Sequence, residues 1–159
     1  MATLYARRTA LSSVGGRLDY VDRDARKYKS TREDLLSTYD GAANLLHGRY
    51  WEYLSRESQA AWAMYGPEDK TRVSRTGKEI ELKAREGQEL VVKLPNSLLD
   101  RLPPDEIARQ LGQTFEQYAG RPCHVAVHWN HDRTNLHAHI IYAERQLLQE
   151  PVEKIAPRN

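Results

Sequence analysis

The sequence predicts an α+β fold, in which helices pack against a mainly antiparallel sheet. Three observations indicate it: an apolar run at residues 90–94, helical periodicity over 104–118, and two strand-like runs at 123–128 and 136–143. The order strand, helix, hairpin is typical of α+β domains rather than of folds with alternating parallel strands. We expect the last two runs to be adjacent central strands, with the helices packed on one face. The 159 residues have the length of one domain, residues 1–159.

The first third of the chain gives the weakest patterns. Residues 3–9 are expected to form a short strand, and the small residues at 12–16 a turn after it. Ser30 and Glu33 have the spacing of a capping box, in which each side chain bonds to the backbone N–H of the other at the start of a helix. This pattern predicts a helix that continues through Tyr39.

The middle of the chain predicts a second helix and then a loop. Aromatic and aliphatic side chains recur over residues 49–64, and Gly66 and Pro67 follow them as helix breakers. Residues 66–79 are polar and charged, so we expect a mobile loop there.

The second half has clearer boundaries. Pro95 ends the first apolar run, because proline has no N–H to donate within a strand ladder. Pro104 at the first helical position, with Asp105 and Glu106 in the first turn, favours a helix start. Gly120 is expected to end that helix, which should cover one face of the sheet.

Charge and cysteine content narrow the class of protein. The 24 basic residues exceed the 22 acidic ones only slightly, for a net charge of +2. Residues 7–29 are locally basic, which suits either phosphate contacts or an ordinary solvated face. The single cysteine, Cys123, cannot form a disulfide within one chain, as in proteins of a reducing compartment. No apolar run approaches the roughly 20 residues that span a bilayer, so we expect a soluble cytoplasmic protein without membrane insertion.

The candidate site is a cluster of histidines near the C-terminus. His137 and His139 alternate along a predicted strand, so both side chains project from the same face. His128 ends the preceding strand, and the hairpin brings it back beside His137. Three imidazoles on one face form a half-shell for a divalent metal ion, with positions left open for substrate oxygens.

Two other histidines lie near this site in the sequence. His124 lies four residues before His128 on the same face, roughly 13 Å away at the rise of a strand, which is too far to share an ion. His131 lies in the loop between the strands and is the alternative to His128 as the third ligand. A single histidine on a strand is usually an ordinary surface or core residue, so the prediction depends on the combination.

The histidine cluster lies within a longer motif. Residues 127–139, VHWNHDRTNLHAH, resemble the three-histidine signature of MobA/MobL-type relaxases, which are members of the HUH endonucleases. Residues 89–95 resemble the Glu-led strand of that family, and residues 16–20 resemble its Gly-Arg…Tyr segment. The resemblance is strongest over 123–145 and looser before Asn44. Relatives continue into further regions, so a domain truncated at its C-terminus and a minimal protein are both open.

The resemblance implies a metal-dependent, site- and strand-specific endonuclease of single-stranded DNA. Such an enzyme nicks an origin of transfer during conjugative plasmid mobilisation in the bacterial cytoplasm. A tyrosine oxygen attacks one phosphodiester, the 3′ hydroxyl leaves, and the 5′ phosphate stays on the enzyme as a phosphotyrosine. The metal is expected to be Mg or Mn, with Zn, Ni or Co as substitutes in vitro. Accessory relaxosome proteins and a coupling protein are the implied partners.

The resemblance also assigns roles to single residues. Tyr20 is the expected nucleophile, with Tyr28 and Tyr39 as alternatives and Tyr5 as a weaker one. Glu89 is expected to be a fourth ligand, a base or an orienter of a ligand, although an exposed strand-end carboxylate would look the same.

Four residues are expected to contact the DNA. Arg17, Arg7 and Arg8 are cations suited to phosphates, and Trp129 is suited to stacking on an unpaired base. Packing in the core or exposure to solvent is the ordinary alternative for each of them.

Other functions are compatible with the same histidines. Rolling-circle replication initiators of the same superfamily usually place the histidine pair before the tyrosine, whereas here Tyr20 precedes the pair and no tyrosine follows Tyr142. A transposase of the superfamily and an unrelated metallohydrolase remain open, and the hydrolase would need no tyrosine. A non-catalytic DNA-binding module should keep its DNA binding after chelation of metal.

Overall fold

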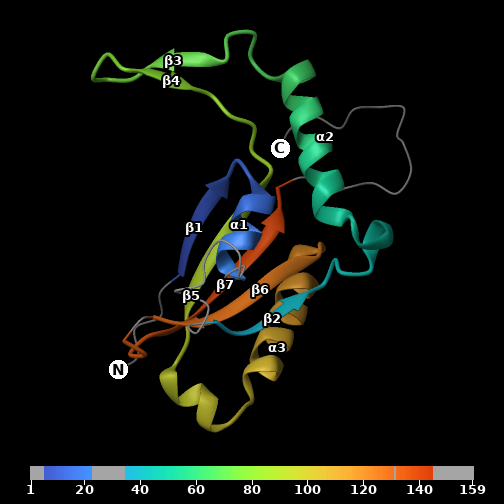
Figure 1. Ribbon diagram of the computed structural model, residues 1–159, viewed down its shortest axis with the longest axis vertical. Coiled ribbons are helices and arrows are strands. Elements are labelled where there is room, and N and C mark those ends of the chain that lie inside the picture. The colour runs from blue at the N-terminus through green and yellow to red at the C-terminus, as the bar shows by residue number, and fades with distance from the viewer. Residues whose placement is uncertain (1–5, 23–34, 131, 145–159) are drawn as a thin grey trace.

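The computed structural model describes residues 6–22, 35–130 and 132–144, which form a five-stranded antiparallel sheet with helices against it (Figure 1). This confirms the predicted α+β class. The strand order is β1-β5-β7-β6-β2. The strands are β1 (Ala6–Leu11), β2 (Leu35–Asp40), β5 (Gly87–Lys93), β6 (Cys123–Trp129) and β7 (Leu136–Ala143). The two histidine-bearing strands are therefore adjacent, with β7 in the centre of the sheet, as predicted.

The central strands are apolar on both faces. Along β7, Leu136, Ala138 and Ile140 face one way, whereas Ile141 and Ala143 belong to a second core cluster on the other face. Because each face is largely buried, the register of these strands is strongly specified. Strand β6 pairs with β7 so that His128 lies opposite His137.

Helix α3 (Pro104–Ala119) covers the first of these faces, over β2 and β6. It begins at Pro104, as the sequence predicts, and packs Ile107 and Ala108 into the core. Gly120 ends it with a φ of +65°, a left-handed conformation that a glycine reaches without a Cβ clash.

Helix α3 approaches β2 and β6 very closely. A Cβ on Gly112 would collide with the ring of Tyr39 on β2, so only glycine fits at this point of the helix. The buried Cys123 lies at the same interface, with its Sγ 3.5 Å from the carbonyl oxygen of Gly112.

Two helices lie against the other face, so the expectation of helices on one face is wrong. Helix α1 (Val14–Val21) and helix α2 (Tyr50–Tyr65) bury Val14, Val21 and Leu54 in the same cluster as Ile141. The pattern at residues 12–16 is the start of α1 rather than a turn. Ser13 is its N-cap, and its Oγ accepts a hydrogen bond from the N–H of Gly16 at 3.2 Å.

A buried carboxylate joins these two helices to the sheet. Glu86 immediately precedes β5 and accepts hydrogen bonds from the N–H of Val14 at 2.9 Å and the hydroxyl of Ser55 at 2.7 Å. The amide of Gln59 donates a third bond at 3.0 Å. The first residue of α1 is thereby fixed beside β5.

One expectation for the first third of the chain is wrong. Residues 35–39, expected to be helical, form β2, because this segment pairs with β6 and places Tyr39 opposite Val125. Ser30 and Glu33 lie outside the described residues. Strand β1 starts at Ala6 within the described residues, which agrees with the predicted strand at 3–9 for the part that can be compared.

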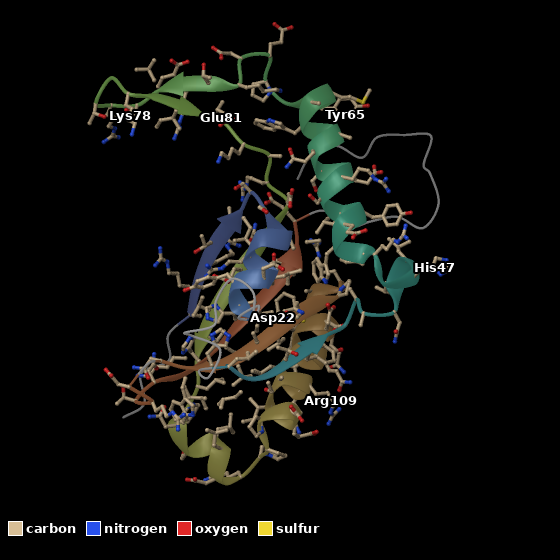
Figure 2. All side chains as sticks on the ribbon, in the orientation of Figure 1. Asp22, His47, Tyr65, Lys78, Glu81 and Arg109 are labelled. Carbon is tan, nitrogen blue, oxygen red and sulfur yellow. The ribbon has the colours of Figure 1, made fainter. Side chains whose placement is uncertain are left out.

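The predicted loop at residues 66–79 holds part of a second, two-stranded sheet. Strands β3 (Thr71–Val73) and β4 (Glu79–Glu81) form a hairpin that extends away from the main sheet, where Lys78 and Glu81 are labelled in Figure 2. Gly77, with a φ of +79°, closes its turn. Both faces of this hairpin are largely exposed, so its strands carry no alternating apolar pattern.

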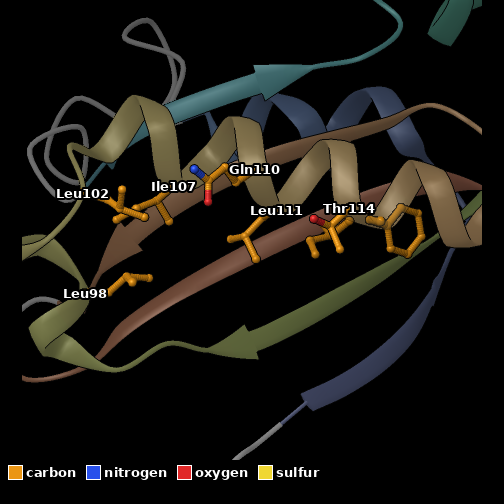
Figure 3. A pocket seen from close by; sticks show the side chains of 8 residues that line it. Leu98, Leu102, Ile107, Gln110, Leu111 and Thr114 are labelled. Atoms are coloured by element: carbon orange, nitrogen blue, oxygen red, sulfur yellow. The ribbon is translucent and has the colours of Figure 1, made fainter.

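Two short 3-10 helices complete the described elements: η2 (Leu45–Gly48) and η3 (Asn96–Asp100). Beside η3, a shallow apolar groove is lined by Leu98, Leu102 and Leu111, on the α3 face of the sheet (Figure 3). Of the helices in the described ranges, none is both long and apolar enough to cross a lipid bilayer.

Candidate metal centre

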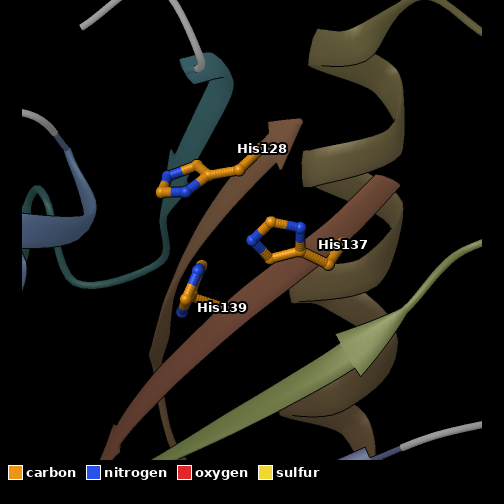
Figure 4. A group of neighbouring side chains, drawn as sticks. All are labelled: His128, His137 and His139. Carbon is orange, nitrogen blue, oxygen red and sulfur yellow. The ribbon is translucent and has the colours of Figure 1, made fainter. Parts of the chain in front are cut away.

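Three histidines converge on the α1 face of the sheet. His128 on β6 and His137 and His139 on β7 each offer a ring nitrogen, and these atoms all lie within 4.8 Å of one another. The ring centroids are 4.7 Å apart for His128 and His139, and 5.1 Å apart for His137 and His139. Figure 4 shows the three rings on the same side of the two strands. The cluster is the one predicted from the sequence and could hold a metal ion.

The strand register explains this convergence. His128 and His137 are cross-strand partners, and His139 lies opposite Ala126, two residues before His128. Side chains two residues apart on a strand share a face, so both pairs point to the same side. His131, the alternative third ligand, lies outside the described residues.

The donor set fits a divalent ion. The Nε2 of the buried His139 has no hydrogen-bond partner among the described residues, and a buried polar atom in that state is costly unless something binds it. The Nε2 of His128 lies 2.5 Å from the carbonyl oxygen of Val21. Donation of the Nε2 proton to that carbonyl leaves Nδ1 of His128 as its ligand atom.

Glu89 is buried behind the cluster, not exposed at a strand end. Its Oε2 lies 3.3 Å from Nδ1 of His139, and Arg17 on α1 donates two hydrogen bonds to its carboxylate at 2.6 and 2.7 Å. Burial alone raises the pKa of Glu89, but His139 and Arg17 outweigh that effect and hold the pKa at about 2. Glu89 is therefore an anion that contacts one of the three histidines.

Tyr20 lies on α1, one turn beyond Arg17. The Arg17 guanidinium carbon sits 4.6 Å from the centroid of the Tyr20 ring, a cation–π contact. The ring is partly accessible, with 36% of the residue exposed. A continuous path of contacts thus runs from Tyr20 through Arg17 and Glu89 to His139.

The alternative tyrosines are placed differently. Tyr39 packs on the α3 face, opposite to the histidines, and its hydroxyl donates to Glu116 at 2.7 Å. That hydrogen bond, together with burial, raises the pKa of Tyr39 to about 12. Tyr5 and Tyr28 lie outside the described residues.

The remaining predicted DNA contacts divide between the two faces. Arg7 pairs with Val91, which lies opposite His139, so Arg7 belongs to the histidine face. Arg8 is its neighbour on β1 and therefore belongs to the other face. Trp129 is half-buried against the α3-side core and does not join the histidines.

His124 has a role that the sequence argument did not find. It is buried, with its Nε2 2.6 Å from Asp22 Oδ1 and its Nδ1 3.3 Å from Asp40 Oδ2. Burial alone lowers the pKa of His124, but the two carboxylates outweigh it and raise the pKa to about 9. The position of His124 four residues before His128 was visible, whereas its partners are far away in sequence.

No protein-family model matches this chain, and no curated protein matches it either.

Proposed function

We propose that this chain is a metal-dependent endonuclease and strand transferase of single-stranded DNA, of the MobA/MobL relaxase type. Its task would be to nick one strand at an origin of transfer and to keep the 5′ end as a phosphotyrosine during plasmid mobilisation. One observation carries the proposal: a three-histidine cluster shares its sheet face with a helix whose Tyr20 is linked through Arg17 and Glu89 to His139. The motif at residues 127–139 supports it from the sequence.

Each residue has a task in this reaction. His128, His137 and His139 would hold a divalent ion, Mg or Mn in the cell, whose chemistry is to withdraw charge from phosphate oxygens. Glu89 orients His139 and so fixes which nitrogen is available. Tyr20 would supply the nucleophile: its oxygen forms a bond to phosphorus while the bond from phosphorus to the 3′ oxygen breaks. The tyrosine proton passes to water, and the departing 3′ oxygen takes up a proton from water.

The Arg17 guanidinium lies between Tyr20 and Glu89. It makes a cation–π contact with the Tyr20 ring and carries a positive charge, which can stabilise the negative charge of a bound phosphate. Its two hydrogen bonds to Glu89 hold that charge in place.

The proposed substrate is single-stranded DNA at an origin of transfer, and accessory relaxosome proteins and a coupling protein are the proposed partners. Arg7, on the histidine face, would contact a phosphate near the site. Arg8 and Trp129 point to the other face and would contact DNA only if the strand passes around the edge of the sheet.

Formation of a covalent protein–DNA adduct tests the proposal. Wild-type protein incubated with Mn²⁺ and a single-stranded origin oligonucleotide should give a slower-migrating band on a denaturing gel. Tyr20→Phe removes only the hydroxyl, so it should lose the adduct and keep its affinity for the oligonucleotide. Tyr39→Phe is the matched control, because its hydroxyl lies on the opposite face, and should form the adduct normally.

Other outcomes point elsewhere. An adduct that persists in Tyr20→Phe and disappears in Tyr28→Phe keeps the relaxase proposal and moves the nucleophile. Cleavage that requires metal but no tyrosine would identify a metallohydrolase instead. DNA binding without any cleavage, unaffected by chelation, would favour a non-catalytic module.

A further inference from the structure

The C-terminal end of α1 is held to strand β6 at two points. The Val21 carbonyl contacts Nε2 of His128, and the Asp22 carboxylate contacts Nε2 of His124 at 2.6 Å. The two histidines are four residues apart on one face of the strand. The helix end therefore lies along β6, and Tyr20 is the residue before this doubly attached segment.

The contact between Asp22 and His124 belongs to a cluster of charged side chains. His124 also lies 3.3 Å from Asp40 at the end of β2. Asp40 in turn accepts hydrogen bonds from the indole of Trp51 on α2 at 3.0 Å and from the N–H of Ala42 at 2.8 Å. Because Trp51 and Ala42 fix Asp40, Asp40 in turn fixes the ring of His124, which holds Asp22.

The electrostatics of helix α1 favour the contact between Asp22 and His124. A carboxylate at the C-terminal end of a helix is unfavourable, since the helix dipole places partial negative charge there. Asp22 is the C-cap of α1, and the last turn of α1 contains no basic residue. His124 provides the compensating positive charge from a different element, and its raised pKa keeps it protonated at neutral pH.

The short length of α1 is a second reason why this helix needs the contact between Asp22 and His124. An eight-residue helix is marginal by itself, so its position depends on its contacts with the rest of the molecule. Its start is fixed by Glu86 and its apolar side by Val14 and Val21. In the last turn, which carries Tyr20, burial of Val21 holds the apolar side, and the ion pair between Asp22 and His124 holds the polar end.

We propose that His124 is a positioning residue for the nucleophile: its ion pair with Asp22 fixes the last turn of α1 and thereby the place of Tyr20 at the metal centre. This inference rests on the proposed function. It assigns to His124 no contact with the ion or with DNA. Removal of the pair should displace the tyrosine while leaving the three ligands and the DNA surface in place.

The experiment uses the full chain and single-turnover adduct formation with Mn²⁺ and the origin oligonucleotide. Asp22→Asn removes the charge of a partly exposed side chain and should fold normally. We expect its maximal adduct rate to fall by about 10²-fold, the effect typical of a misplaced reacting group. The half-saturating DNA concentration and the Mn²⁺ affinity from calorimetry should stay within about twofold of wild type, because neither binding site has changed.

Two further variants separate positioning from folding. His124→Gln should give the same loss of rate, and the double variant should be no slower than either single one, since the two residues act as one pair. Asp100→Asn, a charge removal at an exposed residue of η3, is the control and should retain the wild-type rate.

The results distinguish this inference from the proposed function. If the wild type forms no adduct, the proposed function fails first. If the wild type forms it and Asp22→Asn is as fast, His124 does not position Tyr20. A variant that loses rate only through weaker Mn²⁺ binding would also overturn the inference, because His124 would then act through the metal ligands.

Discussion

Glu89 is a buried carboxylate in contact with one of the three candidate metal ligands, His139. Its pKa is held at about 2. Glu89→Gln keeps the shape and removes the charge, so His139 loses the partner that orients its ring. We expect divalent metal affinity, measured by calorimetry, to fall by about 10- to 100-fold.

The control for this variant is a glutamate far from the cluster. Glu81→Gln, on the exposed β4 strand, should leave the affinity unchanged. Equal affinities for Glu89→Gln and wild type would mean that Glu89 serves only to hold Arg17.

His124 should make the stability of the protein depend on alkaline pH. Its pKa rises from 6.5 to about 9 on folding, because Asp22 on α1 and Asp40 on β2 face it, while Trp51 from α2 does not titrate. A group with a raised pKa stabilises the folded state fully below its unfolded pKa. The stabilisation is then lost as the pH rises from about 6.5 towards 9.

This loss is measurable by urea denaturation at several pH values. One pKa unit corresponds to about 1.4 kcal/mol, so the free energy of unfolding should drop by on the order of 3 kcal/mol across this range. His124→Gln should be less stable at pH 6 and should lack this part of the pH dependence. Parallel curves for the two proteins would show that His124 is not charged in the folded state.

At the scale of single residues, the three histidines of the site could be predicted from the sequence, whereas the contacts of Arg17 and His124 could not. His137 and His139 follow from the two-residue period of a strand, and His128 follows from the hairpin. The Arg17–Glu89 pair joins residues 72 positions apart, and the partners of His124 are also distant. No local pattern encodes such contacts, because they depend on how α1 docks.

At the scale of elements, α3 packs against β2 with no room for a side chain at Gly112. Gly112→Ala would push a methyl group into the ring of Tyr39 and should lower the free energy of unfolding by about 1–3 kcal/mol. Metal affinity of the folded protein should be unchanged, because this interface lies on the opposite face. Denaturant titration and calorimetry measure the two quantities.

Gly15 offers a matched control for that substitution. It lies in α1, and a Cβ added there meets no atom within 4 Å. Gly15→Ala should therefore stabilise the protein, by roughly 0.5–1 kcal/mol, through better helix propensity. A destabilised Gly15→Ala would show that α1 needs glycine for a reason beyond space.

The elements that sequence reasoning missed share a physical cause. Helix α1 begins with a pair of glycines, residues 15 and 16, which local propensity assigns to a turn. Its helical state depends on the Ser13 cap and on burial of Val14 and Val21. Strand β2 is likewise decided by pairing with β6, whereas the long amphipathic α3 was predictable from its own sequence.

At the scale of the whole molecule, metal binding should be linked to folding. The three candidate ligands come from two central strands, so the unfolded chain cannot present them together. An ion at about 100 times its Kd should raise the free energy of unfolding by about 2.7 kcal/mol. The midpoint of thermal unfolding with and without Mn²⁺ checks this.

A double variant, His137→Ala with His139→Ala, shows whether the stabilisation by Mn²⁺ comes from binding at the histidine cluster. It should unfold at the same temperature with and without Mn²⁺. An equal rise in both proteins would place the ion somewhere other than the histidine cluster.

The class of the fold was predictable because each of its central features is local in sequence. The β6–β7 hairpin and α3 occupy one continuous stretch, and β5 directly precedes it. The distribution of helices over both faces was not predictable, because it depends on α1. As a result, the packing of α1 on the histidine face was not predicted.

The reactivity of Cys123 can report the separation of α3 from the sheet. It is the single cysteine of the chain, it is fully buried under α3, and burial raises its pKa to about 12. A thiol-reactive probe can therefore label the native protein only when α3 separates from the sheet. The labelling rate of the unmodified sequence measures how often that layer detaches, without any engineered residue.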